Sequence, residues 1–236
     1  MTATPGLGDD GAGTAAISNF AEIDLASPPS IARGEARVHE VRRRVATPAT
    51  LAGYGRLVRD FDTTEVTIVP WPVAGRRPLV PGTGAEGGIV EGTFDMARTG
   101  ERLWAVNHAV GRRYLTGWFA DPATARDDRT PADTSRLFTH EANYHPDGGQ
   151  VFFPRARRAF VALLARPGDD VTPDDFVAFA FDGSCGVHID PGVWHQPLFP
   201  VGERLAFDDK QGRVHACVSV SFVAEFGVYL SVPLAP

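Results

Sequence analysis

The sequence predicts a mainly β domain, an antiparallel sandwich or barrel with a few short helices. From Arg136 onward, short apolar runs alternate with turn residues, and no run shows a long helical period. Short strands at this spacing, separated by Gly, Pro, Asn and Asp, are typical of all-β architectures. The expected strands are residues 151–153, 159–165, 176–181, 194–199, 214–222 and 226–232.

Length and composition favour one globular domain and exclude several classes of protein. The 236 residues are 43% hydrophobic and 22% charged, and the net charge is −6. Disorder of the whole chain is therefore excluded, and a nucleic-acid partner is not expected, because phosphate binding needs clustered positive charge. No apolar run approaches the roughly 20 residues that cross a bilayer, so no membrane partner is expected. With two cysteines and no apolar signal-peptide core near Met1, a cytoplasmic location is expected.

The N-terminal part divides into an arm and the start of the domain. Residues 1–30 are rich in Gly, Ala, Thr, Asp and Pro and have no hydrophobic period, so they are expected to form a disordered arm. Residues 31–236 are expected to form the single domain. Within it, residues 31–44 are charged and only weakly periodic, which fits either a short helix or an edge strand.

The next segment carries turn signals and one β-branched run. Thr47 is a good N-cap and Pro48 follows it, so residues 47–55 are expected to form one or two helical turns. The run at 64–69 predicts a strand. Glycine and proline are dense between residues 76 and 100, which predicts a long flexible loop of the kind that often covers a binding mouth.

Two further strands are expected before the polar loop at residues 121–131. They are residues 103–110 and 114–119, joined by a Gly-Arg-Arg turn. His108 lies in the first of them among apolar residues, where a hydrogen-bonded structural role is favoured over a metal ligand.

One stretch, residues 191–198 with the sequence PGVWHQPL, combines a tight turn, an aromatic ring and an imidazole. Pro191 fixes φ and Gly192 permits a positive φ, so the turn delivers Trp194 and His195 to opposite faces of a strand. The pattern resembles the second metal motif of cupin barrels, and residues 140–154 resemble the first, with a glutamine where the glutamate usually stands. The two motifs together predict a cupin-like antiparallel β-barrel, that is, a double-stranded β-helix or jelly roll.

Eight short segments extend this resemblance: residues 51–55, 140–141, 145–146, 150–154, 159–164, 186–187, 193–195 and 197–199. On these segments the chain resembles the ureidoglycolate lyase family of cupin-like enzymes. The resemblance covers about residues 47–235; it is strong from 140 to 199 and faint from 61 to 133. The chain departs from the family pattern at Asn143 and Tyr144, where Glu and Arg are usual, and at residues 189–191, where many members have a Tyr-His-Arg run.

The resemblance implies an enzyme of allantoin and purine nitrogen catabolism that cleaves ureidoglycolate to glyoxylate and urea as a homodimer. A divalent first-row metal ion (Ni, Mn, Fe or Zn) is the expected cofactor, with His145, Gln150 and His195 as ligands. Imidazoles and a side-chain carbonyl can leave positions open for a bidentate 2-hydroxycarboxylate. A hydrogen-bonded polar cluster without metal is the alternative.

The candidate catalytic residues are Glu141, His188 and Asp190, of which Glu141 or His188 would move the proton. His140 and Glu141 point to opposite faces of a strand, so at most one reaches the cavity, and Glu141 is preferred as the base. His188 and Asp190 would share one face, so Asp190 could orient a nearby imidazole or join the ligand set. An outward-facing position of this pair fits the sequence equally well.

Arg155, Trp194 and Tyr144 are the candidates for binding the small carboxylate substrate. Arg155 offers a bidentate fork to a carboxylate, and Trp194 could wall the pocket. Two other functions remain open, because Asn143, Tyr144 and Asp190 occupy positions of likely ligands in the family pattern. One is a metal-dependent enzyme for another 2-hydroxy or 2-oxo acid or a sugar acid, and the other is a non-catalytic ligand-binding cupin.

Overall fold

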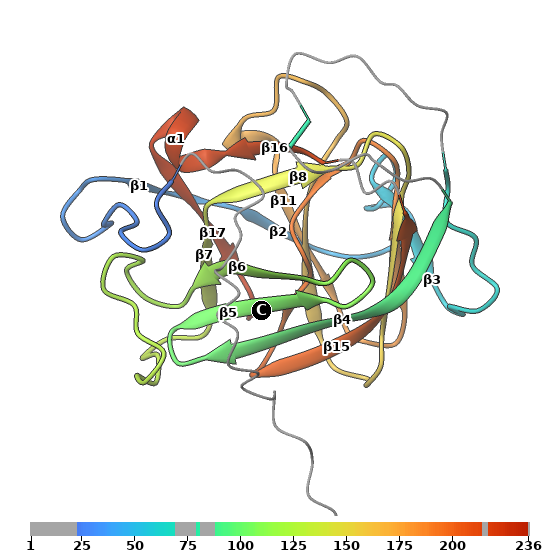
Figure 1. The fold of residues 1–236 in the computed structure, drawn as a ribbon, viewed down its shortest axis with the longest axis horizontal. Helices are drawn as coiled ribbons and strands as arrows, with labels where there is room; N and C mark the ends of the chain where they lie inside the picture. The colour runs from blue at the N-terminus through green and yellow to red at the C-terminus, as the bar shows by residue number, and fades with distance from the viewer. Residues whose placement is uncertain (1–22, 69–78, 81–87, 214–216, 236) are drawn as a thin grey trace, which may run out of the picture.

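The computed structural model describes residues 23–68, 79–80, 88–213 and 217–235, and these form two β-sheets (Figure 1). The ten-stranded sheet contains, in spatial order, β1 (Arg37–Glu40), β17 (Val228–Pro233), β7 (Arg136–Thr139), β6 (Arg112–Trp118), β5 (Arg102–Asn107), β4 (Ile89–Thr99), β15 (Arg204–Gly212), β9 (Gln150–Pro154), β12 (Gly186–Ile189) and β3 (Gly55–Val58). The seven-stranded sheet contains β16 (Val218–Ser221), β8 (Glu141–Tyr144), β13 (Trp194–His195), β10 (Phe160–Ala165), β11 (Val177–Phe181) and β2 (Arg42–Val45), with β14 (Phe199–Pro200) paired to β10.

Helices contribute little to the described structure. They are a 3₁₀ turn at Pro173–Asp175 and α1 at Phe222–Phe226. The predicted mainly β, cupin-like class is therefore confirmed, as two sheets that share one core. Neither helix in the described ranges is long and apolar enough to span a bilayer.

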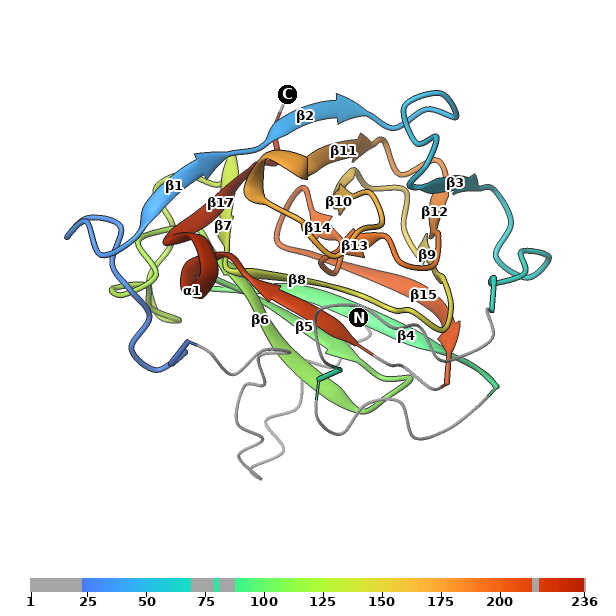
Figure 2. The ribbon, with the colours of Figure 1, turned by 90° about the horizontal axis from the view of Figure 1, so that it is seen from above.

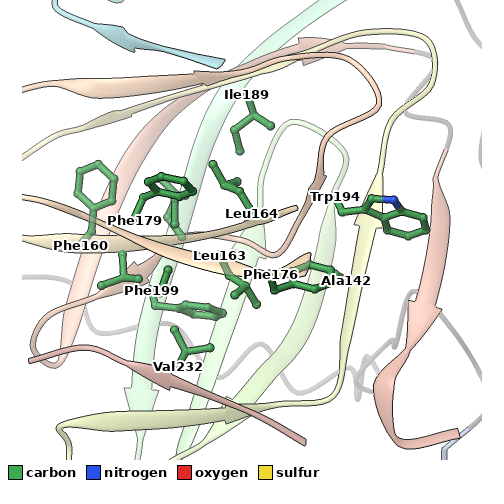
Figure 3. Packing of buried hydrophobic residues seen from close by; sticks show 14 of the residues in the cluster. Ala142, Phe160, Leu163, Leu164, Phe176, Phe179, Ile189, Trp194, Phe199 and Val232 are labelled. Atoms are coloured by element: carbon green, nitrogen blue, oxygen red, sulfur yellow. The ribbon is translucent and has the colours of Figure 1, made fainter. Parts of the chain in front are cut away.

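The core lies between the two sheets. One cluster of buried side chains joins Phe94 and Phe207 of the ten-stranded sheet to Phe160 and Leu164 of the seven-stranded sheet. Figure 3 shows part of this cluster around Phe160, Leu164 and Phe199. In Figure 2 strands β8 and β16 lie over β4, β5 and β6, and Figure 1 shows the two groups of strands apart, so they belong to opposite layers of the sandwich.

The strands expected from the sequence are largely present, and residues 31–44 take the edge-strand alternative. They contain β1, parallel to β17, and β2, parallel to β11, each at the edge of its sheet. The strand expected at 64–69 is reduced to one bridge between Ile68 and Gly148, and residue 69 lies outside the described residues.

The helix expected at residues 47–55 is wrong. The segment is a run of turns in which two bonds span four residues, from Leu51 N to Thr47 O at 3.0 Å and from Gly55 N to Leu51 O at 3.1 Å, but these bonds are not consecutive. The predicted N-cap is present, because Thr47 N donates to Thr50 Oγ1 at 2.8 Å and Thr50 N donates to Thr47 Oγ1 at 3.1 Å, the reciprocal pattern of a helix start. The turns do not continue as a helix, and the chain enters β3 at Gly55.

The long loop expected at residues 76–100 is wrong from Ile89 onward. That part is β4, eleven residues long, which pairs with β5 on one side and β15 on the other. Its apolar face is short, since Phe94 and Met96 alone are buried among polar and small residues. Pairing with the next strand, β5, and with the distant β15, and not its own composition, therefore makes β4 a strand.

The last residues of the expected arm contact the domain. Ser30 Oγ donates to Asp121 Oδ2 at 2.7 Å, and Tyr229 Oη donates to Pro29 O at 3.0 Å. Ile23 and Leu25 pack on a second cluster that contains Trp118 and Tyr229. Residues 23–30 are thus part of the packed structure, and residues 1–22 of the expected arm lie outside the described residues.

Candidate functional site

A small, partly open cavity lies between the two sheets and is lined mostly by polar side chains and aromatic rings. Its innermost part, about 20 Å³, has room for one water molecule or a single ion, and the whole pocket, including its open side, encloses about 310 Å³. The ten-stranded sheet supplies side chains from β4, β5, β6 and β9, and the other side comes from β8, β13 and the residue before β16. The lining residues are Phe94, Asn107, Tyr114, Asn143, His145, Gln150, Phe152, His195, Pro197 and Cys217.

His195 is placed in the cavity by the turn that precedes it. Gly192 adopts φ 76°, which favours glycine, and His195 then pairs with Leu164 on one side and Asn143 on the other. His195 Nδ1 donates to Val193 O at 2.8 Å, so Nε2 carries the lone pair. Burial and the neighbouring His145 lower the pKa of His195 to about 3, and the ring is therefore neutral.

His145 follows β8 and lies beside His195, with 5.1 Å between the ring centroids. Its carbonyl accepts a hydrogen bond from Gly192 N at 3.1 Å, which joins the two motifs directly. Its Nδ1 is 3.5 Å from Cys217 Sγ. The two imidazoles and this thiol form one wall of the cavity.

Gln150 faces them from β9, and its side-chain amide has a fixed orientation. Nε2 donates to Asp209 Oδ1 and to Gln211 Oε1, both at 2.7 Å. Because both amide hydrogens are used by acceptors, the amide oxygen is the atom left for the cavity. Asn107 Nδ2 lies 3.5 Å from Gln211 Oε1 and extends the chain of amides.

Asp209 is a buried carboxyl group that sequence reasoning missed. It lies on β15 opposite Phe152, and within the described part of the chain Oδ2 has no hydrogen-bond partner. Burial raises the pKa of Asp209 to about 7, against the opposing effect of the Gln150 hydrogen bond. The sequence feature that could have identified Asp209 is the alternation along β15, where Phe207, Asp209 and Gln211 are buried on one face of the strand.

Glu141 shares a face of β8 with Asn143, because alternate residues of a strand point the same way. Burial raises the pKa of the cavity residue Tyr114, and Cys217, Glu141 and Asp209 add to the rise, so both carboxyl groups lie near this ring. His140 is buried beside Glu141: its Nε2 lies 3.7 Å from Glu141 Oε1, and its ring packs edge-on against Trp118 at 5.3 Å.

The structure brings His188 and Asp190 together, but not to the cavity. His188 Nδ1 lies 3.1 Å from Asp190 Oδ1, and His188 Nε2 accepts a hydrogen bond from Thr67 N at 3.1 Å. His188 pairs with Val151, and residues opposite each other share a face. Val151 alternates with Gln150 and so faces away from the cavity, packed on Val58 and Val66. The pair therefore holds the segment around Thr67 on the outer face of the sheet.

The three predicted substrate-binding residues also lie away from the cavity lining. The Arg155 side chain is 56% exposed and pairs with Asp208 at 3.3 Å. Tyr144 and Trp194 pack edge to face at 4.7 Å, and Trp194 Nε1 donates to Gly168 O at 2.7 Å. Both rings belong to the hydrophobic core, so their burial stabilises the sandwich.

The cavity offers three side chains that could hold a metal ion. The described residues contain no cluster of three or more His, Cys, Asp and Glu side chains suited to a metal. The donors present are instead two imidazoles, His145 and His195, and the amide oxygen of Gln150, and the hydrogen bonds of His195 and Gln150 already orient two of these donors. Oriented nitrogen and oxygen donors of this type fit a first-row divalent ion.

Comparison with known proteins gives one consistent result. Residues 127–228 match the family model described as ureidoglycolate lyase. The chain is 32% identical over 113 residues to proteins named ureidoglycolate lyase from Salmonella paratyphi B, Salmonella newport and Salmonella typhimurium. Each match covers 44% of this chain and 69% of the relative. The matched family segment contains the cavity residues from Asn143 to Cys217, whereas Phe94, Asn107 and Tyr114 precede it.

Proposed function

This chain belongs to the ureidoglycolate lyase family, and we propose that it is a carbon–nitrogen lyase that cleaves ureidoglycolate to glyoxylate and urea. The observation that carries the proposal is the convergence of His145, Gln150 and His195 on one cavity. These side chains come from the two motifs of the family pattern. Polar side chains that converge on one pocket can orient a small, polar substrate.

The reaction needs one proton to leave the substrate and one to return. The carbinol oxygen loses its proton and forms the carbonyl of glyoxylate, while the carbon–nitrogen bond breaks and the urea nitrogen takes up a proton. Glu141, on the cavity face of β8, is the proposed group that moves this proton. Gln150 presents its amide oxygen, and the neutral imidazole of His195 presents Nε2.

We further propose that His145, Gln150 and His195 hold a divalent first-row metal ion. Such an ion would act as a Lewis acid that binds the 2-hydroxycarboxylate and lowers the pKa of its hydroxyl group. The protein's part is to keep the His195 imidazole neutral, through its burial and the neighbouring His145, and to fix the amide of Gln150 through hydrogen bonds to Asp209 and Gln211.

The test is a glyoxylate-release assay and elemental analysis on one preparation of purified protein. We expect glyoxylate and urea in equal amounts, about one metal ion per chain, and loss of activity after removal of the metal with a chelator. Folded protein that releases no glyoxylate, but acts on another 2-hydroxy or 2-oxo acid in a substrate panel, would replace ureidoglycolate as the substrate. Binding without any turnover would favour a ligand-binding cupin.

We also propose that the protein is a cytoplasmic homodimer. Strands β1, β2, β3 and β16 end their sheets within the described structure, and an exposed sheet edge can pair with a second copy. Cys185 and Cys217 are buried and form no disulfide in the described structure, as in proteins of a reducing compartment. Light scattering at micromolar concentration is expected to give about twice the 25.4 kDa of one chain, and a mass near one chain would contradict the dimer.

A further inference from the structure

A 2-hydroxycarboxylate brings a negative charge, and the predicted partner for it, Arg155, lies on the outer face of the sheet. None of the described side chains that line the cavity is a lysine or an arginine. Two of the lining residues, Asn107 and Tyr114, nevertheless define a face of β5 and β6 on which one arginine lies.

Arg112 is this arginine, and two register relations place it on the cavity side. It pairs directly with Asn107 across β5 and β6, and residues opposite each other in an antiparallel pair share a face. It also precedes Tyr114 by two residues, which again gives the same face. Its exposure is intermediate, so the side chain is neither enclosed in the core nor fully in solvent.

The adjacent arginine confirms the alternation. Arg113 is exposed, and its guanidinium carbon lies 3.9 Å from the centroid of the Trp104 ring. Trp104 alternates with Ala105 and Asn107 and is therefore on the opposite face of β5. Two neighbouring arginines thus face different sides of one sheet, one toward the cavity and one away from it.

The charge of Arg112 acts on the cavity residue Tyr114, two positions along β6. Burial raises the pKa of Tyr114, and the positive charge of Arg112 opposes this rise. The guanidinium therefore lies within electrostatic reach of a side chain that lines the cavity.

We propose that Arg112 binds the carboxylate of the substrate at the rim of the cavity and makes the site specific for small 2-hydroxy acids. The class of substrate rests on the proposed function. A guanidinium can bind a carboxylate with two parallel hydrogen bonds. With the carboxylate at Arg112, the carbinol group extends inward toward His145, Gln150 and His195.

Glycolate and glycolamide test this proposal, because they have nearly the same shape and differ in charge. Dissociation constants would be measured by calorimetry for the wild-type protein and for Arg112→Gln, Arg112→Lys and Arg113→Gln. Arg112→Gln is expected to weaken glycolate binding by about tenfold to a hundredfold, the effect of one hydrogen bond to a charged group, and to leave glycolamide binding unchanged. Arg112→Lys should keep part of the preference for glycolate, and Arg113→Gln, the matched control, should keep all of it.

Three results would overturn the proposal: wild-type protein without a preference for glycolate, Arg112→Gln with wild-type affinity for glycolate, or equal losses in Arg112→Gln and Arg113→Gln. If Arg112→Gln does not fold, the affinity of Arg112→Lys for glycolate is the test. Full affinity in this variant, which has a compact ammonium group, would exclude a bidentate role for Arg112. Turnover of ureidoglycolate is measured separately. Arg112-dependent glycolate binding in a protein that does not cleave ureidoglycolate would contradict only the proposed reaction.

Discussion

Replacement of His195 by alanine is expected to give a folded protein without bound metal. Its turnover should be lower than that of the wild type by at least about a hundredfold. The variant lacks Nε2, the imidazole atom that the bond from Nδ1 to Val193 O leaves for the cavity. If His195 is instead only part of a hydrogen-bonded polar cluster, the free energy of unfolding should fall by about 1–3 kcal/mol, and turnover per folded molecule should stay the same.

Metal content, melting temperature and turnover on one preparation separate these two results. His108→Ala is the matched control, because His108 is half-exposed, pairs with Asp95 at 3.0 Å and does not line the cavity. A folded His195→Ala protein with full metal content and full turnover would exclude the proposed site.

Replacement of Asp209 by asparagine is expected to stabilise the protein at pH 8 and to have little effect at pH 4. The pKa of Asp209 rises from 3.8 to about 7 in the folded protein because the group is buried. At about 1.4 kcal/mol for each pH unit, this rise of about 3 units amounts to on the order of 4 kcal/mol. Asparagine keeps an oxygen acceptor for Gln150 Nε2 and has no charge to bury.

The direction of the effect follows from the protons bound in each state. Between pH 3.8 and about 7 the folded protein keeps the Asp209 proton that the unfolded chain has lost. The unfolded state then binds fewer protons, so the free energy of unfolding of the wild-type protein falls as the pH rises through this window. Urea unfolding from pH 4 to pH 8 should show the difference between Asp209→Asn and wild type growing with pH.

Asp208→Asn serves as the control for this measurement. Asp208 is the preceding residue on β15, and its side chain is 34% exposed and paired with Arg155. Its variant should follow the wild-type pH dependence. Parallel curves for Asp209→Asn and wild type would show that the Asp209 carboxyl is not held in its neutral form.

The mainly β class and the segments that carry the cavity's histidines and glutamine could be predicted from the sequence alone. These features depend on local chemistry. Alternating apolar runs and turn residues define the strands, and the Pro-Gly turn fixes where His195 enters β13. His145, Gln150 and His195 were identified together because they belong to two compact motifs, which the hydrogen bond from Gly192 N to His145 O joins.

Two features follow only from the tertiary structure: which face of each strand is turned toward the cavity, and which distant strands complete the cavity lining. Side chains alternate along a strand, so the sequence shows that His188 and Asp190 share a face. It does not show that this face is turned away from Gln150, because the relative orientation depends on the pairing of β12 with β9. Arg112 belongs to the local hairpin of β5 and β6, but only the fold places this hairpin beside the cavity. Asp209 reaches the cavity region through the pairing of β15 with β4 and β9, two strands far from it in the chain. Such pairings leave little trace in the local sequence, because a strand is stabilised by neighbours that the sequence places elsewhere.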